Sequence, residues 1–172
     1  HAAEQLALAA DHCTRAAEGA WDGAWYRRGY YDDGRPLGSE ACGECRIDAI
    51  AQAFAALDTH ADPGRVHTAL TSAVEHLFDR EHNVVRLFDP PITRRTPETG
   101  YVRSYGAGLR ENGGQYTHGA LWLAMALLRT GRTAEGAEIL HAVLPAAHDP
   151  ARYEGEPYVL AADIAGCLLY TS

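Results

Sequence analysis

A run of nine apolar residues, from Ala120 to Leu128, is the feature that most limits the folds open to this chain. The run is too short for a membrane-spanning helix, which needs roughly 20 apolar residues. It is apolar on nearly every side, so we expect a helix buried inside the protein. The residues directly before it contain Gly113-Gly114, a pair that favours a tight turn. Such a turn would place Thr117 and His118 at the start of the helix.

His118 is therefore the first candidate for a functional residue. The first turn of a helix has free backbone N–H groups and the positive end of the helix dipole, so it attracts anions. An imidazole at this place can add a further donor. The same residues also fit a plain helix start with a structural histidine. Chemistry alone favours that second interpretation, because no single feature of the segment is diagnostic.

Apolar residues at helical spacing predict further helices on both sides of this segment. The expected ranges are 2–17, 44–57, 63–78 and 133–143, with one more helix opened by Pro157. In the second helix we expect the buried face to consist of Ile47, Ile50, Ala51, Phe54 and Leu57. In the fourth we expect it to consist of Ala137, Leu140, Val143 and Leu144. Asp62 and Thr133 are expected N-caps, and the short link 129–133 predicts an antiparallel helical hairpin.

Three other stretches lack a helical period. The aromatic segment 21–31 is expected to be extended and to turn at residues 32–36, and 84–88 is a candidate strand. Residues 89–109 form a long irregular segment, which in a compact domain is usually a functional loop. Aromatic rings beside acids and arginines suit a sugar site, through stacking and hydroxyl hydrogen bonds. A hairpin that lines the core explains the aromatic segment equally well.

Charge and length exclude some classes of function. The chain has 172 residues, about one domain, and a formal charge of −8, which argues against binding to nucleic acid or to an anionic membrane surface. Cys42 and Cys45 form a C-x-x-C pair, but no second ligand pair follows for zinc, and no thioredoxin-like context surrounds it. We therefore expect free thiols in a reducing cytosol, and neither a metal nor a cofactor.

Five segments of the chain carry a family resemblance: Trp21 to Arg28, Asp32 to Ser39, Glu44 to Gln52, Arg110 to His118, and Glu156 to Asp163. In this order they resemble the cellobiose phosphorylase family, the inverting β-glycoside phosphorylases of glycoside hydrolase family 94. The chain is most similar to the branch that acts on β-1,2-glucans, which contains the phosphorylase domains of cyclic β-1,2-glucan synthases and the 1,2-β-oligoglucan phosphorylases.

The resemblance implies an all-α fold, part of an (α/α)6 barrel of helical hairpins with long loops and short strands. That barrel needs more helices than this chain holds. Residues 1–172 are therefore expected to be the C-terminal portion of one barrel-type catalytic domain, truncated at both ends. Residues 1–20 would be a leading helix, and residues 165–172 no longer follow the family pattern.

The resemblance also assigns roles to the central motif. His118 lies seven residues after Glu111, as in the family, and is expected to contact phosphate. Glu111 matches the sugar-binding carboxylate, and Arg110 holds a basic position near the acceptor sugar. We expect the neighbouring side chains Asn112, Gln115 and Tyr116 to support the turn. The family's general acid belongs to an Asp-Trp-Asn-Asp motif that this sequence lacks, so no catalytic residue is expected here and the chain alone should be inactive.

The expected function is the inverting phosphorolysis of β-glucosides, with β-1,2-glucan as substrate, to α-glucose 1-phosphate. In such chemistry an acid protonates the leaving oxygen while the nucleophile attacks the opposite face of the sugar. Inorganic phosphate is the co-substrate and β-glucan the other partner, and the location is cytoplasmic. This segment is not expected to contact a membrane, although the parent protein can be membrane-associated, and a homodimer is left open. An inverting hydrolase on a similar barrel and a non-catalytic α-hairpin binding module are the alternatives.

Overall fold

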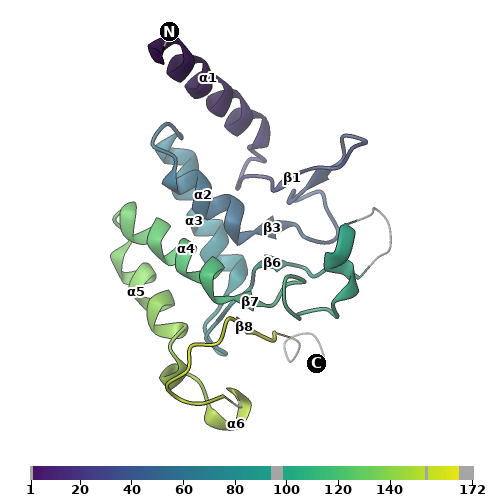
Figure 1. The fold of residues 1–172 in the computed structure, drawn as a ribbon, viewed down its shortest axis with the longest axis vertical. Coiled ribbons are helices and arrows are strands. Elements are labelled where there is room, and N and C mark those ends of the chain that lie inside the picture. Colours follow the sequence, from purple (N-terminus) through teal and green to yellow (C-terminus); the bar gives the residue numbers. More distant parts are fainter. Residues whose placement is uncertain (1, 94–98, 154, 167–172) are drawn as a thin grey trace.

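The computed structural model describes residues 2–93, 99–153 and 155–166, and its regular structure is mostly helical, as predicted (Figure 1). The helices are α1 (Ala2–Ala20), α2 (Ala49–Leu57), α3 (Pro63–Leu77), α4 (Thr117–Arg129), α5 (Thr133–Ala142) and α6 (Pro150–Tyr153). Gly100–Ser104 and Pro145–Ala147 are 3-10 helices. None of these helices is both long and apolar enough to cross a bilayer, within the ranges described.

The strands are short and pair two by two. They are β1 (Gly29–Tyr30), β2 (Pro36–Leu37), β3 (Ile47–Asp48), β4 (Phe78–Asp79), β5 (Val84–Val85), β6 (Phe88–Asp89), β7 (Gln115–Tyr116) and β8 (Asp163–Ile164). The antiparallel pairs are β1 with β2, β3 with β6, β4 with β5, and β7 with β8. The first pair confirms the expected turn after the aromatic segment. The single strand expected over 84–88 is instead two strands with different partners.

The core lies between four helices. Helix α4 packs against both α2 and α5, and α2 also packs against α3. Leu70, Leu77, Leu123, Leu127 and Ile139 are fully buried where these helices meet. Burying one such side chain contributes about 1.5–3 kcal/mol. Trp25 and Tyr26 join this core, so this part of the aromatic segment lines the core.

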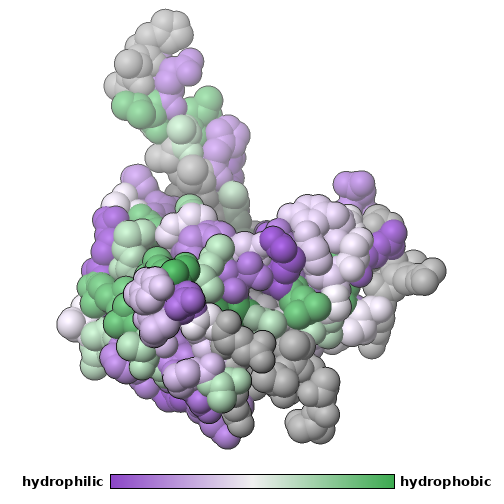
Figure 2. All heavy atoms as spheres, turned by 60° about the horizontal axis from the view of Figure 1, so that its bottom comes forward, coloured by the Kyte–Doolittle hydropathy of each residue, from purple (hydrophilic) through white to green (hydrophobic). Residues whose placement is uncertain are grey.

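Helix α1 stands away from this body, and Leu6 and Leu8 on it are exposed (Figures 1 and 2). Figure 2 shows hydrophobic and hydrophilic residues interspersed over the visible face of the body.

Helix α3 begins as predicted, since Asp62 accepts a hydrogen bond from the Arg65 N–H at 2.8 Å and Pro63 is its first residue. A proline fits there because the first N–H of a helix has no helical partner.

The expected start and buried face of α2 were wrong. Residues 47 and 48 form β3, and Asp48 caps the helix by accepting from the Ala51 N–H at 3.0 Å. The buried face consists of Ala49, Gln52 and Ala53, whereas Phe54 is 51% exposed. Gln52 can be buried because its amide accepts from the Tyr26 N–H and donates to the Tyr26 carbonyl, both at 2.8 Å.

Helix α4 begins at Thr117, as expected, but only one side of it is buried. Met125 is 41% exposed, and Leu128 is also exposed. The expected buried face of α5 was mostly wrong: Val143, just after the helix, is buried as expected, but Ala137, Leu140 and Leu144 are exposed. The buried residues within α5 are Gly136, Ile139 and Ala142. A Cβ on Gly136 would lie 2.8 Å from Cγ of Leu128. Close approach of α4 therefore fixes the rotation of α5. Thr133 is the first helical residue of α5 and not its N-cap.

The helix expected after Pro157 is absent from the described residues, because a turn forms there instead. The Val159 N–H donates to the Glu156 carbonyl at 3.0 Å. After this turn the chain is extended and passes beside the first residue of α4. There the Thr117 hydroxyl donates to the Ala161 carbonyl at 2.7 Å. These bonds and the β7–β8 pair hold the segment extended. Most of the expected off-pattern tail, residues 167–172, lies outside the described residues.

Candidate functional site

The turn before α4 presents Arg110 and Glu111 at its tip. The Asn112 N–H donates to the Leu109 carbonyl at 2.9 Å, and Arg110 has a φ of 48°. Gly113 has a φ of 83°, and a Cβ there would lie 3.2 Å from the Phe88 carbonyl oxygen. Glycine adopts this positive φ without strain, and few other residues do. The expected tight turn is confirmed, and it begins earlier than the glycine pair.

Two buried amides fasten this turn to the core. Asn112 accepts from the Ile92 N–H at 2.7 Å and donates to the carbonyls of Ile92 and Tyr105, each at 2.8 Å. Gln115 accepts from the Val85 N–H at 2.7 Å. Both side chains are fully buried. The expected supporting role of Asn112 and Gln115 is thereby confirmed, and the side chains at the tip are held in place.

Glu111 lines a cavity of about 310 Å³ together with Arg28, Tyr31, Thr99 and Tyr101. The rest of the wall is Leu37, Cys45, Leu87, Phe88, Ile92 and Val102. Oε1 of Glu111 accepts from the Tyr101 hydroxyl at 3.3 Å, whereas Oε2 is buried and has no hydrogen-bond partner among the residues that the structure describes. A buried oxygen without a partner costs free energy that a ligand hydroxyl would recover. The Glu111 carboxylate also raises the pKa of Tyr101.

Arg28 supplies a cation to the same cavity. Its Nη1 donates to Oδ2 of Asp48 at 2.5 Å, and Asp48 is 0% exposed. The Arg28 side chain itself is 45% exposed. The Asp48 carboxylate raises the pKa of Arg28, so the guanidinium stays charged. The cavity thus has a hydrogen-bond acceptor in Glu111 and a donor group in Arg28.

His118 is the second residue of α4 and is exposed, so hydrocarbon side chains do not enclose it. Its ring meets the rings of Tyr116 and Trp122 edge-on, with centroids 5.2 and 5.0 Å apart. Tyr116, the residue before the helix, makes no capping side-chain hydrogen bond. His118 does not line the Glu111 cavity.

Tyrosines connect the three predicted site residues. The Arg110 guanidinium lies 5.7 Å from the Tyr105 ring centroid, and a side-chain hydrogen bond with Tyr116 raises the pKa of Arg110. Tyr101 and Tyr105 meet at right angles, 6.2 Å apart. Side-chain contacts therefore connect Glu111 to His118 through four intermediate residues, in the order Tyr101, Tyr105, Arg110 and Tyr116. The sequence analysis did not single out Tyr101 or Tyr105. Their position in the long irregular loop was the one signal that could have identified them as site residues.

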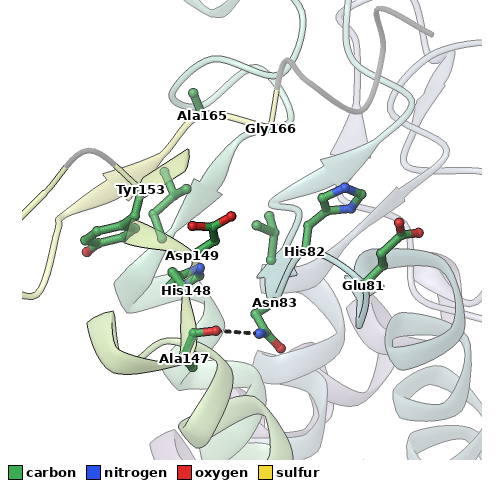
Figure 3. Close-up of a pocket in the computed structure, with 11 residues that line it drawn as sticks. Glu81, His82, Asn83, Ala147, His148, Asp149, Tyr153, Ala165 and Gly166 are labelled. Atoms are coloured by element: carbon green, nitrogen blue, oxygen red, sulfur yellow. Dashed lines mark hydrogen bonds between the residues drawn. The ribbon is translucent and has the colours of Figure 1, made fainter. Parts of the chain in front are cut away.

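A larger cavity, of about 430 Å³, lies on another part of the molecule (Figure 3). Asn83 donates there to the Ala147 carbonyl at 2.8 Å, and His148 stacks on Tyr153. None of the predicted site residues lines it. We take the smaller cavity as the candidate site, because it holds Glu111 with its unpaired oxygen.

The cysteines offer no nucleophile to the candidate site. Cys45 lines the cavity, but burial raises its pKa, so it stays a neutral thiol. Cys42 and Cys45 are both free. Cys167 and the side chain of Cys13 are outside the described part of the chain. In that part, no three or more His, Cys, Asp or Glu side chains form a group that could hold a metal ion.

Known proteins match nearly the whole chain. The model of the glycosyl hydrolase 94 superfamily catalytic domain matches residues 1–167. The chain is 44% identical over 154 residues to the cyclic beta-(1,2)-glucan synthase NdvB of Rhizobium meliloti, covering 87% of this chain and 5% of that protein. It is 32% identical over 144 residues to a 3-O-beta-D-glucopyranosyl-beta-D-glucuronide phosphorylase of Paenibacillus borealis, covering 83% and 18%. It is 30% identical over 149 residues to a cellobionic acid phosphorylase of Neurospora crassa, covering 86% and 19%. The chain thus spans less than a fifth of the length of these relatives.

Proposed function

The chain belongs to the glycosyl hydrolase 94 superfamily, and from this membership we propose that it serves the inverting phosphorolysis of β-glucosides. The names of two relatives, both phosphorylases, support the reaction type. The name of the third, a cyclic beta-(1,2)-glucan synthase, supports β-1,2-glucan as the substrate. The products would be α-glucose 1-phosphate and a glucan shortened by one unit.

We place the hairpins α2–α3 and α4–α5 in an (α/α)6 barrel, whose remaining helices other parts of the protein supply. Helices that pack side by side and are joined by short links support this placement. The long loops between them would form one end of the barrel. The site would then lie where the turn at Arg110 meets the loop at Tyr101.

In the proposed step, an oxygen of phosphate attacks the anomeric carbon from the face opposite the leaving group. The glycosidic C–O bond breaks, its electron pair goes to the leaving oxygen, and a carboxylic acid gives that oxygen a proton. Phosphate is already an anion, so no base is needed. We assign the acid to no residue of this chain, which has no Asp-Trp-Asn-Asp motif.

Within that step we assign three roles to the residues at the turn and on α4. Glu111 accepts hydrogen bonds from sugar hydroxyls, Arg110 stands on the acceptor side, and His118 with the first turn of α4 binds phosphate. The observation that carries the proposal is that Glu111 lines a cavity and that its Oε2 is buried without a hydrogen-bond partner among the described residues. We also place the protein in the cytoplasm, which the free thiols of Cys42 and Cys45 support.

The test uses the full-length protein that carries this segment, incubated with β-1,2-glucan with and without inorganic phosphate. We expect α-glucose 1-phosphate to form only when phosphate is present. Release of free glucose at the same rate without phosphate would overturn the proposal and favour the inverting hydrolase. An absence of any reaction, together with retained glucan binding, would favour the non-catalytic binding module.

A further inference from the structure

Arg28 comes from a different part of the chain than the motif around Glu111, yet it lines the same cavity. It lies just before β1 in the aromatic segment. Among the described residues, its guanidinium bonds to one side chain, Asp48, through Nη1. A guanidinium has five N–H donors in a planar fork, so donors remain for a ligand.

The position of Arg28 is fixed from two sides. Its backbone N–H donates to the Leu37 carbonyl at 2.9 Å, and a Cβ on Gly38 would lie 2.5 Å from the Arg28 nitrogen. On the other side, Asp48 is itself held, because its second oxygen accepts from the Ala51 N–H at the start of α2. The guanidinium is thus pre-organised, and a ligand that binds it need not order it first.

We propose that Arg28 is a substrate-binding residue that donates hydrogen bonds to the sugar unit held by Glu111, and that Asp48 is its positioning residue. The proposal rests on the proposed function. An ionised Glu111 only accepts hydrogen bonds and Arg28 only donates them. A sugar has hydroxyls that do both, so one unit can donate to Glu111 and accept from Arg28. The cavity of about 310 Å³ is at the small end of ligand sites, which suits a single sugar unit.

The opposing explanation is that Arg28 merely neutralises the buried Asp48. The two explanations differ in what Arg28→Lys does in the full-length protein. Lysine keeps a positive charge near Asp48 but lacks the planar fork. We expect the KM for glucan to rise about 10-fold or more, as for a lost hydrogen bond to a charged group. The KM for phosphate should stay within about twofold, since His118 does not line this cavity.

Arg27→Lys is the matched control, because Arg27 is the neighbouring arginine, pairs with Asp22, and does not line the cavity. Both KM values should be unchanged in it. An Arg28→Lys protein that loses stability but keeps the wild-type KM for glucan would overturn the proposal. If Arg28→Lys does not fold, Arg28→Gln combined with Asp48→Asn removes both charges together and is measured in the same way. Turnover of the wild-type protein without phosphate would overturn the proposed phosphorolysis but not the role of Arg28. The KM for glucan of the Arg28→Lys protein would still test that role.

Discussion

The hydroxyl of Tyr101 donates to Oε1 of Glu111 at 3.3 Å, and this bond joins the 3-10 helix Gly100–Ser104 to the turn that precedes α4. The other oxygen of Glu111 is buried and has no hydrogen-bond partner in the described part of the chain. One oxygen of this carboxylate is therefore bound to the protein, and we expect the other to accept a hydrogen bond from a ligand.

Glu111→Gln should lower kcat/KM for glucan by about 10- to 100-fold, because it replaces a charged acceptor of sugar hydroxyls with a neutral amide. The measurement is the phosphorolysis rate of the full-length protein as a function of glucan concentration. Glu138→Gln is a suitable control, since Glu138 pairs with Arg80 on the surface and does not line the cavity. An unchanged glucan dependence in Glu111→Gln would remove Glu111 from the site.

Tyr101→Phe should have a smaller effect, raising the KM for glucan about two- to fivefold. It removes one long hydrogen bond that orients Glu111, of the kind that contributes about 0.5–1.5 kcal/mol. Tyr101 is 64% exposed, so the melting temperature should not change. A loss of stability with an unchanged KM would mean that the bond serves only the fold.

His118→Ala should raise the KM for phosphate by about 10- to 100-fold and leave the KM for glucan nearly unchanged, because it removes one donor to an anion. The side chain is exposed, so stability should hardly change. The matched control is His67→Ala, at an exposed histidine on α3. Equal phosphate dependence in the two variants would contradict the assigned role and favour the binding module.

Gly136→Ala should destabilise the protein by about 1–3 kcal/mol, because the new methyl group would lie 2.8 Å from Cγ of Leu128. Denaturant unfolding of the full-length protein measures the change. Gly19→Ala, on α1, has nothing within 4 Å of the added Cβ and should not destabilise. Equal stability of both variants would show that α4 and α5 are not packed so closely.

Local sequence predicted the turn and the start of α4 because few residues besides glycine adopt the φ of Gly113 and because the run from Ala120 is continuously apolar. It failed on which faces of α2 and α5 are buried. Those faces depend on partners far along the chain, such as Tyr26 for Gln52 and Leu128 for Gly136. Periodicity alone places Phe54 and Leu140 inside, where the folded chain leaves them exposed.

The candidate site was likewise predictable only in part. Glu111, Arg110 and His118 stand together in one motif, so a family resemblance could single them out, and their roles stay predictions. Tyr101 comes from a segment without any period, and Arg28 meets Asp48 across 20 residues of sequence. Contacts of that kind arise from the tertiary arrangement and leave no pattern in the sequence itself.

The walls around Glu111 come from segments near residues 28, 45, 88, 101 and 111. No peptide cut from any one of them would contain the pocket, so the affinity for sugar that we propose for it can appear only after the chain has folded. A bound glucose unit would then contact both the β1–β2 hairpin and the turn before α4, and so would hold them together. Ligand that binds only the folded form must protect it, so saturating glucan should slow proteolysis of these two loops together.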